Sequence, residues 1–398
     1  MPDVHPAVVK PEMRKEVSPR KIMLIFSGVK FDLDRDCGLR LRKLSERFEG
    51  ISFAAHTHAT EAQFGRFGLT AIRFNGAGIG FSLRYFFGGL LWALRERLRG
   101  APISLVVTTD PLKTGVLGWL IARLIGARFA PEVNGDYWNA ANYLDGPGTL
   151  TGRIKRRLVT ALGSFVLGRA DGIRILYPTQ IDFLRSRLGG KVVHSIFDIS
   201  DYADFEDLGE DPVVLFAGFP FFIKGVDVLI QAFQRVAPQF PDWTLKILGW
   251  FPDRTALDHY RAGHPQIIDH PAVKHREMPR HIGRAGIVVL PSRSEGMGRV
   301  LVEAMFAGKA RIGANVGGIP TVINDGLDGL LFEAGNVDQL ADRLTRLMSD
   351  AGLRARLGYA ARERALREFS LDRYLQRISA FYGEVLSMQA EHCNSEPQ

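Results

Sequence analysis

Short apolar runs alternate with longer amphipathic stretches along most of the chain. The run KIMLIFSG at 21–28 ends in Gly28 and predicts a buried strand. Because strands that alternate with helices form parallel βαβ units, the pattern predicts a doubly wound parallel sheet. In this half, further strands are predicted at 51–56, 70–74, 103–109, 128–133 and 171–178, and helices near 38–48, 84–99 and 112–125.

The alternation restarts after the polar stretch DYADFEDLGEDP at 201–212, which is typical of a linker. The next apolar run, VVLFAG, is followed by a stretch with Val226, Leu229, Ile230 and Phe233 at helical spacing. Strands are predicted at 213–218, 243–249, 286–292 and 310–315, and helices at 351–368 and 374–386.

The length of 398 residues suits two α/β domains. We predict a flexible leader over 1–20, an N-terminal domain over 21–200 and a C-terminal domain over 213–370. The leader has no apolar run long enough for a signal peptide, and no window reaches the length of a membrane span. Cys37 and Cys393 offer neither a disulfide framework nor a zinc spacing, so we expect a cytoplasmic protein.

The net charge of +8 is unevenly distributed. Residues 1–200 carry 29 Lys and Arg and 17 Asp and Glu, a net +12, whereas residues 201–398 are net −4. A basic half suggests nucleic acid or an anionic membrane surface. No aromatic-basic RNA motif and no helix-turn-helix signature supports nucleic acid, so we expect no nucleic-acid partner.

Two basic stretches also carry large apolar residues, FSLRYFFGGLLWALRERLRG at 81–100 and GRIKRRLVTALGSFVLGRA at 152–170. Apolar helices with cationic ends are typical of membrane-interfacial helices. We therefore hypothesise that the first half lies on the inner membrane face and takes a lipid-linked or lipid acceptor. The alternative is that both helices cover the sheet and their charges are solvated.

Three motifs in the second half contain candidate binding residues. In GFPFFIKG at 218–225, Gly218 ends a parallel strand and Lys224 opens a helix, which is a good place for a diphosphate. The alternative is a plain turn beside a solvated lysine.

In LPSRSEGMGRVLVEAMFAG at 290–308, Glu295 lies in a loop and Glu303 about one turn into a helix. Carboxylates accept hydrogen bonds from sugar hydroxyls, and Gly296 and Gly298 let backbone approach a ligand. On spacing alone, a surface Glu295 and a dipole-stabilising Glu303 explain the pattern as well.

In NVGGIPTVIND at 315–325, Gly317 and Gly318 precede a helix that starts near Pro320. Such a turn can point N–H groups at an anion, or it can be a tight connection.

The order of these motifs, continued by DGLDGLLFEAGN at 325–336, resembles the C-terminal domain of the family 4 retaining glycosyltransferases. The resemblance covers about 213–350 strongly and 21–200 more weakly. It implies the GT-B fold, two Rossmann-like domains facing across a cleft, with acceptor binding in the N-terminal domain and donor binding in the C-terminal domain. The helix at 371–388 would cross back to the N-terminal domain.

The resemblance also implies roles for individual residues. Glu303 would bind the ribose, Glu295 the donor-sugar hydroxyls and Lys224 the diphosphate. The remaining donor contacts would come from Gly28, Gly218, Gly296, Met297, Gly298, Arg299, Gly317 and Gly318.

The sequence departs from the family at two positions. Phe219 stands where the family usually has Arg, which leaves Lys224 to carry more of the diphosphate charge. Asn134 stands where the family often has His, and Asn134 can hydrogen-bond a hydroxyl but cannot shuttle a proton. Asp136, two residues on, is a candidate substitute, with a loop cap as the alternative.

These observations predict an enzyme, a retaining hexosyltransferase that uses a nucleotide-diphosphate sugar as donor substrate and a lipid-linked or glycan acceptor, in surface polysaccharide or glycolipid synthesis. We predict no cofactor and no metal, since DLD at 32–34 is the chance match to an Asp-x-Asp signature. The predicted catalytic residues are Glu295, Lys224, Asp136 and Asn134. The alternative is a non-catalytic, degenerate sugar-nucleotide-binding subunit, suggested by Phe219 and Asn134.

Overall fold

The computed structural model describes residues 21–30, 36–74, 76, 78–100, 102–143, 150–189, 191–198, 201–251 and 254–388. The predicted leader at 1–20 and Cys393 lie outside the described residues.

The first half forms an eight-stranded sheet in the order β3-β4-β2-β1-β5-β6-β7-β8. Within the described residues the paired strands of this sheet are parallel, except that β3 runs antiparallel to β4. The central strand β1 is buried from Ile22 to Phe26, as expected when helices cover both faces of a parallel sheet. The strands are β1 (Lys21–Lys30), β2 (Glu49–His56), β3 (Thr60–Phe64), β4 (Phe67–Arg73), β5 (Ile103–Thr108), β6 (Arg128–Val133), β7 (Gly172–Ile175) and β8 (Val192–Ser195).

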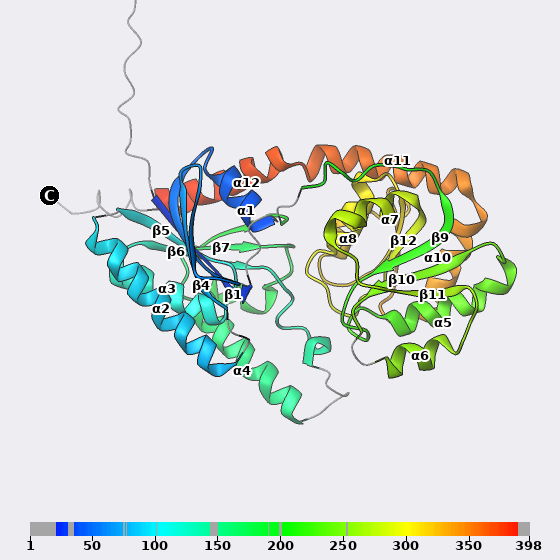
Figure 1. Ribbon diagram of the computed structural model, residues 1–398, viewed down its shortest axis with the longest axis horizontal. Coiled ribbons are helices and arrows are strands. Elements are labelled where there is room, and N and C mark those ends of the chain that lie inside the picture. Colours follow the sequence, from blue (N-terminus) through cyan, green and yellow to red (C-terminus); the bar gives the residue numbers. More distant parts are fainter. Residues whose placement is uncertain are drawn as a thin grey trace, which may run out of the picture.

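Helices cover both faces of this sheet. In Figure 1, α2 (Ile79–Leu98), α3 (Lys113–Ile125) and α4 (Leu150–Leu167) lie together on one side, and α1 (Asp36–Leu44) and α12 (Leu371–Ser387) lie on the other. Two short 3-10 helices complete this half, η1 (Ala140–Tyr143) and η2 (Asp182–Arg187).

The second half forms a six-stranded, all-parallel sheet in the order β11-β10-β9-β12-β13-β14. The strands are β9 (Asp211–Ala217), β10 (Thr244–Gly249), β11 (Ile267–Pro271), β12 (Ala285–Leu290), β13 (Ala310–Ala314) and β14 (Leu330–Phe332). The helices are α5 (Val226–Val236), α6 (Thr255–Arg261), α7 (Met278–Arg284), α8 (Arg299–Phe306), α9 (Ile319–Val322), α10 (Val337–Ser349) and α11 (Ala351–Glu368), with 3-10 turns η3 (Ala237–Gln239) and η4 (His275–Glu277).

In both sheets the strand order reverses at the first strand of the half, between β1 and β5 and between β9 and β12. Ligands of doubly wound sheets bind outside the carboxyl ends of the strands at such a switch point. The predicted α/β class with two doubly wound sheets is confirmed, and each sheet offers one expected binding edge.

The last helix, α12, packs against the first sheet and contacts β5 to β8. Its residues Phe381 and Val385 lie so close to Gly172 of β7 that a Cβ there would be 2.3 Å from a methyl of Val385. The chain therefore returns from the second half to the first, and Figure 1 shows α12 beside the first sheet.

Candidate functional site

The loop after β9 brings Lys224 to the β9/β12 switch point. Gly225, which ends this loop, has a φ of +67°, and a Cβ on it would lie 2.0 Å from the carbonyl oxygen of Pro291. This close approach seats the loop against the end of β12. Lys224 then donates from Nζ to Oε2 of Glu295 at 2.6 Å, and both side chains are mostly buried.

The loop after β12 holds Glu295 by several bonds besides that ion pair. The hydroxyl of Ser292 donates to Oε2 of Glu295 at 3.4 Å, and the Gly296 amide donates to Oε1 at 3.1 Å. Gly298 ends the loop as the N-cap of α8 with a φ of +80°, a conformation that favours glycine. The Glu295 carboxylate is therefore fixed at the carboxyl edge of the sheet.

Gly317 and Gly318 pack directly against this loop. A Cβ on Gly317 would lie 2.0 Å from the carbonyl oxygen of Glu295, and a Cβ on Gly318 would lie 2.0 Å from that of Gly296. The two glycines are thus required by backbone contact between two loops. The helix that follows, α9, has only four residues.

Glu303 lies on α8 and is 4% exposed. Met297 is also buried, whereas Arg299, the first residue of α8, places its guanidinium 3.4 Å from Oδ2 of Asp198. The structure thus gathers Glu295, Gly296, Met297 and Gly298 at the switch point and directs the Arg299 side chain towards the connection between the two halves.

The loop that carries Glu295 also contacts the first half of the chain. A Cβ on Gly296 would lie 3.1 Å from Leu176 and 3.6 Å from the carbonyl oxygen of Asn134. Ser294 donates to Oδ2 of Asp136 at 3.4 Å. The site therefore lies where the carboxyl edges of the two sheets meet.

Asp136 occupies a partly desolvated position at this junction. Burial, the largest effect, raises the pKa of its carboxyl, and the charge of Glu295 raises it further. Hydrogen bonds from Asn139, at 3.0 Å, and from Ser294 and Tyr177 act in the opposite direction. Asp136 is therefore easier to protonate than an ordinary aspartate, which is a property that marks functional carboxylates.

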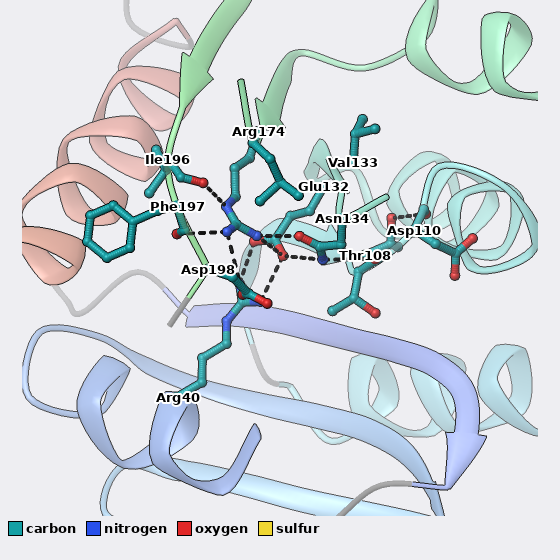
Figure 2. Close-up of polar contacts among 12 residues, drawn as sticks. Arg40, Thr108, Asp110, Glu132, Val133, Asn134, Arg174, Ile196, Phe197 and Asp198 are labelled. Atoms are coloured by element: carbon teal, nitrogen blue, oxygen red, sulfur yellow. Dashed lines mark hydrogen bonds and ion pairs between the residues drawn. The ribbon is translucent and has the colours of Figure 1, made fainter. Parts of the chain in front are cut away.

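Asn134 belongs to a buried ionic network, shown in Figure 2. Arg174 donates to its Oδ1 at 2.6 Å, and its Nδ2 donates to the carbonyl oxygen of Thr109 at 3.0 Å. Both polar atoms of the side-chain amide are therefore hydrogen-bonded within the protein. The atom of Asn134 that faces Gly296 is its backbone carbonyl oxygen.

Glu132 is the centre of that network. It accepts from Nη1 of Arg40 at 2.7 Å and from Nη1 of Arg174 at 3.2 Å, and all three side chains are buried. Burial pushes the pKa of Glu132 upwards, but the charges of Arg40 and Arg174 outweigh burial and bring the pKa to about 2. Tyr382 of α12 also contacts Arg40 and Glu132. The network therefore links α12 to the strand β6 that precedes Asn134.

Phe219, which replaces the family's usual arginine, is half exposed. Its ring lies 5.0 Å from that of Trp250, which is also exposed and follows β10. The switch-point edge therefore presents an aromatic pair beside Lys224.

On the other side of the junction, Gly28 lies near the end of β1, next to Ser27, whose amide donates to the hydroxyl of Thr109 at 2.7 Å. Three contributors to this edge were not singled out from the sequence: Ser294, Asp110 and Tyr137. Asp110 lies two residues after β5, directly after the strand predicted at 103–109, and this position at the carboxyl end of a strand is the signal that could have found it.

No helix in the described part of the chain combines the length and the apolar character needed to cross a membrane.

Comparison with known proteins finds a family match over most of the second half of the chain. The model of "Glycosyl transferases group 1" matches residues 201–364. D-inositol 3-phosphate glycosyltransferase of Xylanimonas cellulosilytica is 34% identical over 183 residues, which cover 44% of this chain and 43% of that protein. Alpha-D-kanosaminyltransferase of Streptomyces kanamyceticus is 25% identical over 321 residues, 75% of this chain and 82% of that protein. The chain thus spans less than half the length of some curated relatives and most of others.

Solved structures agree on the fold. Sucrose-phosphate synthase from Thermosynechococcus elongatus superposes with a TM-score of 0.76 at 16% identity, covering 93% of this chain and all of that one. Anabaena HepE in complex with UDP superposes with a TM-score of 0.68 at 15% identity, covering 92% and 100%. The GT-B fold expected from the sequence is confirmed, and residues 201–364 of the chain match the group 1 glycosyl transferases.

Proposed function

We propose that the protein is a retaining glycosyltransferase that moves a hexose from a nucleotide-diphosphate sugar to an acceptor hydroxyl, without a metal. The observation that carries this proposal is the meeting of Lys224 and Glu295 at the β9/β12 switch point, opposite Asp136. A cation beside a carboxylate suits a ligand that has a diphosphate next to sugar hydroxyls.

The donor would lie along the carboxyl edge of the second sheet. Lys224 neutralises the diphosphate, and Gly218 and Gly28 let it approach the strand ends. Glu295 accepts hydrogen bonds from the sugar, and Glu303 accepts them from the ribose. Further contacts come from the backbone at Gly296, Met297, Gly298 and Arg299, held in place by Gly317 and Gly318.

The reaction would need orientation more than a protein nucleophile. The acceptor oxygen forms its bond to the anomeric carbon on the face from which the diphosphate leaves, and the departing phosphate oxygen takes the acceptor proton. Lys224 stabilises the charge that develops on that phosphate. Asp136 orients a hydroxyl at the junction, and Asn134, whose amide is held by Arg174, contributes its carbonyl and the position of its loop.

A second candidate is a sugar-nucleotide-binding subunit without turnover. It is favoured by Phe219 in place of an arginine and by the occupied amide of Asn134. Incubation with a panel of nucleotide sugars separates the two: slow hydrolysis of at least one donor supports the enzyme, and binding without hydrolysis or transfer supports the subunit.

The surface of the first half gives support for an acceptor located at a membrane. One stripe of large apolar residues on α2 points to solvent at spacings of three to four along the whole helix. Leu98 is 87% and Ile79 82% exposed. Its members are Ile79, Leu83, Phe87, Leu91, Leu94 and Leu98.

Helix α4, in the same layer, has a stripe of the same kind, formed by Leu150, Ile154, Leu158, Leu162 and Phe165. A helix that packs on a sheet normally turns such a stripe inwards. Exposed cations flank both stripes, namely Arg84, Arg95, Arg97 and Arg99 on or beside α2 and Arg153, Lys155, Arg156 and Arg157 on α4. This combination fits the interface of an anionic membrane.

We therefore place the protein on the inner face of the cytoplasmic membrane, with a lipid-linked or glycan acceptor of surface polysaccharide or glycolipid synthesis. Co-sedimentation with phosphatidylglycerol vesicles at low salt tests this placement. The protein should pellet with the vesicles, and the double variant Leu83→Glu and Phe87→Glu should stay in the supernatant. Leu327→Glu, which changes an exposed leucine of the second half, is the matched control and should pellet. A wild-type protein that stays in the supernatant would contradict the placement.

A further inference from the structure

A cavity of about 450 Å³ opens at the switch point of the first sheet, outside the carboxyl ends of β1 and β5. It lies between the first turns of α2 and of α3. Its walls are mainly apolar and aromatic, including Phe81, Tyr85, Phe86 and Leu117. A mostly apolar cavity at a switch point is the usual form of a small-molecule site.

Asp110 is the acidic group of this cavity. Its Oδ2 accepts from the Thr114 hydroxyl at 2.5 Å and its Oδ1 accepts from the Leu112 amide at 2.8 Å. Within the described residues it forms no ion pair, since the nearby Lys113 donates to Ser82 instead. Burial raises the pKa of Asp110, and those hydrogen bonds and the charge of Lys113 oppose the rise.

Asp110 is a partly buried carboxylate whose nearby cation, Lys113, is bonded to Ser82, and each of its oxygens can accept a second hydrogen bond. Asp110 therefore has capacity left for a hydroxyl that enters the cavity.

The cavity adjoins the site described above. Tyr137 lines the cavity, and its neighbour Asp136 receives the hydrogen bond from Ser294 of the donor loop. Asn134 of the same segment donates to the carbonyl of Thr109, next to Asp110. Figure 2 shows Asp110 beside Asn134 and Thr108. The segment 134–137 therefore borders both the cavity and the junction where donor transfer would occur.

The cavity also adjoins the apolar stripe on α2. Phe86 lines the cavity, and its ring is 5.6 Å from that of Phe87, a member of the stripe. Apolar side chains of α2 therefore lie both on its solvent-exposed stripe and on the cavity wall, in contact through Phe87 and Phe86. A molecule with one apolar and one hydroxylated end would match both parts.

We propose that this cavity is the acceptor site, and that the acceptor is a neutral, hydroxyl-bearing amphiphile: a hydroxyl donates to Asp110, and the apolar part lies against Phe81 and Phe86 and leads out along α2. The cavity's role as an acceptor site rests on the proposed transferase function.

Binding of octyl β-D-glucopyranoside, below its critical micelle concentration, tests the proposal by isothermal titration. The wild-type protein should bind it saturably and should bind glucose far more weakly. Asp110→Asn should weaken binding about tenfold, as expected for loss of a charged hydrogen-bond acceptor. Ser82→Phe, which fills the cavity from its half-buried rim, should abolish binding, and this variant decides the question if Asp110→Asn does not fold.

Three results would overturn the proposal: no saturable binding, unchanged binding in both cavity variants, or loss of binding only in the stripe variant Leu83→Glu with Phe87→Glu. Hydrolysis of a panel of nucleotide sugars, with UDP-glucose among them, by the wild-type protein is measured separately. If it is absent, the proposed function fails, and with it the acceptor role, whereas the titration still decides whether the cavity binds an amphiphile.

Discussion

Lys224 donates a hydrogen bond to Glu295 at 2.6 Å although the two residues are 71 positions apart. The loops after β9 and β12 meet because both strands end at the same edge of a parallel sheet. The Lys224 ammonium and the Glu295 carboxylate therefore lie side by side. A single ligand can place its diphosphate at Lys224 and its hydroxyls at Glu295.

Lys224→Met should weaken UDP binding about tenfold, because one charge-assisted contact to the diphosphate is lost. Binding of uridine should not change. Isothermal titration with both ligands measures the difference. Lys43→Met is the matched control, since Lys43 forms a similar ion pair with Glu46 on the other half. Equal UDP affinity in the Lys224→Met variant and the wild type would remove Lys224 from the diphosphate site.

Asp136→Asn should raise the melting temperature at pH 7 and lower the transfer rate about tenfold. The folded pKa of Asp136 is raised, so the folded state binds the proton more tightly than the unfolded chain. Its contribution to stability is fully present below the unfolded pKa and is lost as pH rises through the folded pKa. The difference in melting temperature between Asp136→Asn and the wild type should therefore be smaller in acid. Thermal melts at pH 7 and pH 4 check this, and a variant that melts lower than the wild type at pH 7 would contradict it.

Glu132→Gln should lower the free energy of unfolding by about 3–5 kcal/mol at pH 7, because Arg40 and Arg174 lose the buried counter-charge that they share and Arg174 keeps only Asp198, at 3.6 Å. The folded pKa of Glu132 is about 2, against an ordinary value of 4.5, so its stabilisation is present above 4.5 and is lost as pH falls towards 2. Urea unfolding at pH 7 and pH 3 should show the two proteins converging in acid. Glu46→Gln, on the exposed pair with Lys43, should cost less than about 1 kcal/mol. If Glu132→Gln also lowers the free energy of unfolding by less than about 1 kcal/mol, the network contributes little to stability.

Gly318→Ala should destabilise the protein by roughly 1–3 kcal/mol and weaken UDP binding, because the new Cβ meets the carbonyl oxygen of Gly296 and must push the Glu295 loop away. Gly189→Ala is the control, since a Cβ there meets nothing within 4 Å. Chemical unfolding and UDP titration measure both effects. If the two alanine variants behave alike, the contact between the loops does not shape the site.

The strands that the sequence predicts are those in the interior of each sheet, where continuous apolar runs are buried on both faces. The four strands that were not predicted, β3, β8, β11 and β14, are the edges of the two sheets and have three to five residues each. In β3 every second residue is exposed, so no apolar run exists to be detected. Short edge strands form because a neighbour is present to pair with them.

The candidate donor residues could be found because their signals are local: Gly218 ends a predicted strand, and Glu295 and Gly317 each follow one. The state of Asn134 could not be found in this way. Its partners, Thr109 and Arg174, lie 25 and 40 positions away, and only the fold brings them to its amide. Asp110 was missed although it follows the strand predicted at 103–109, because no motif marks it and the cavity beside it is visible only in three dimensions.

The central claim is that Glu295 binds the sugar of a nucleotide-sugar donor in an active transferase. The most direct test compares hydrolysis of UDP-glucose and other nucleotide sugars by the wild-type protein and by Glu295→Ala, with Glu333→Ala, an exposed carboxylate change in the same half, as control. We predict slow hydrolysis of at least one donor by the wild type and by Glu333→Ala, and a fall of about a hundredfold in Glu295→Ala with the fold retained. Equal hydrolysis by Glu295→Ala and the wild type, or none by the wild type with any donor, would contradict the claim.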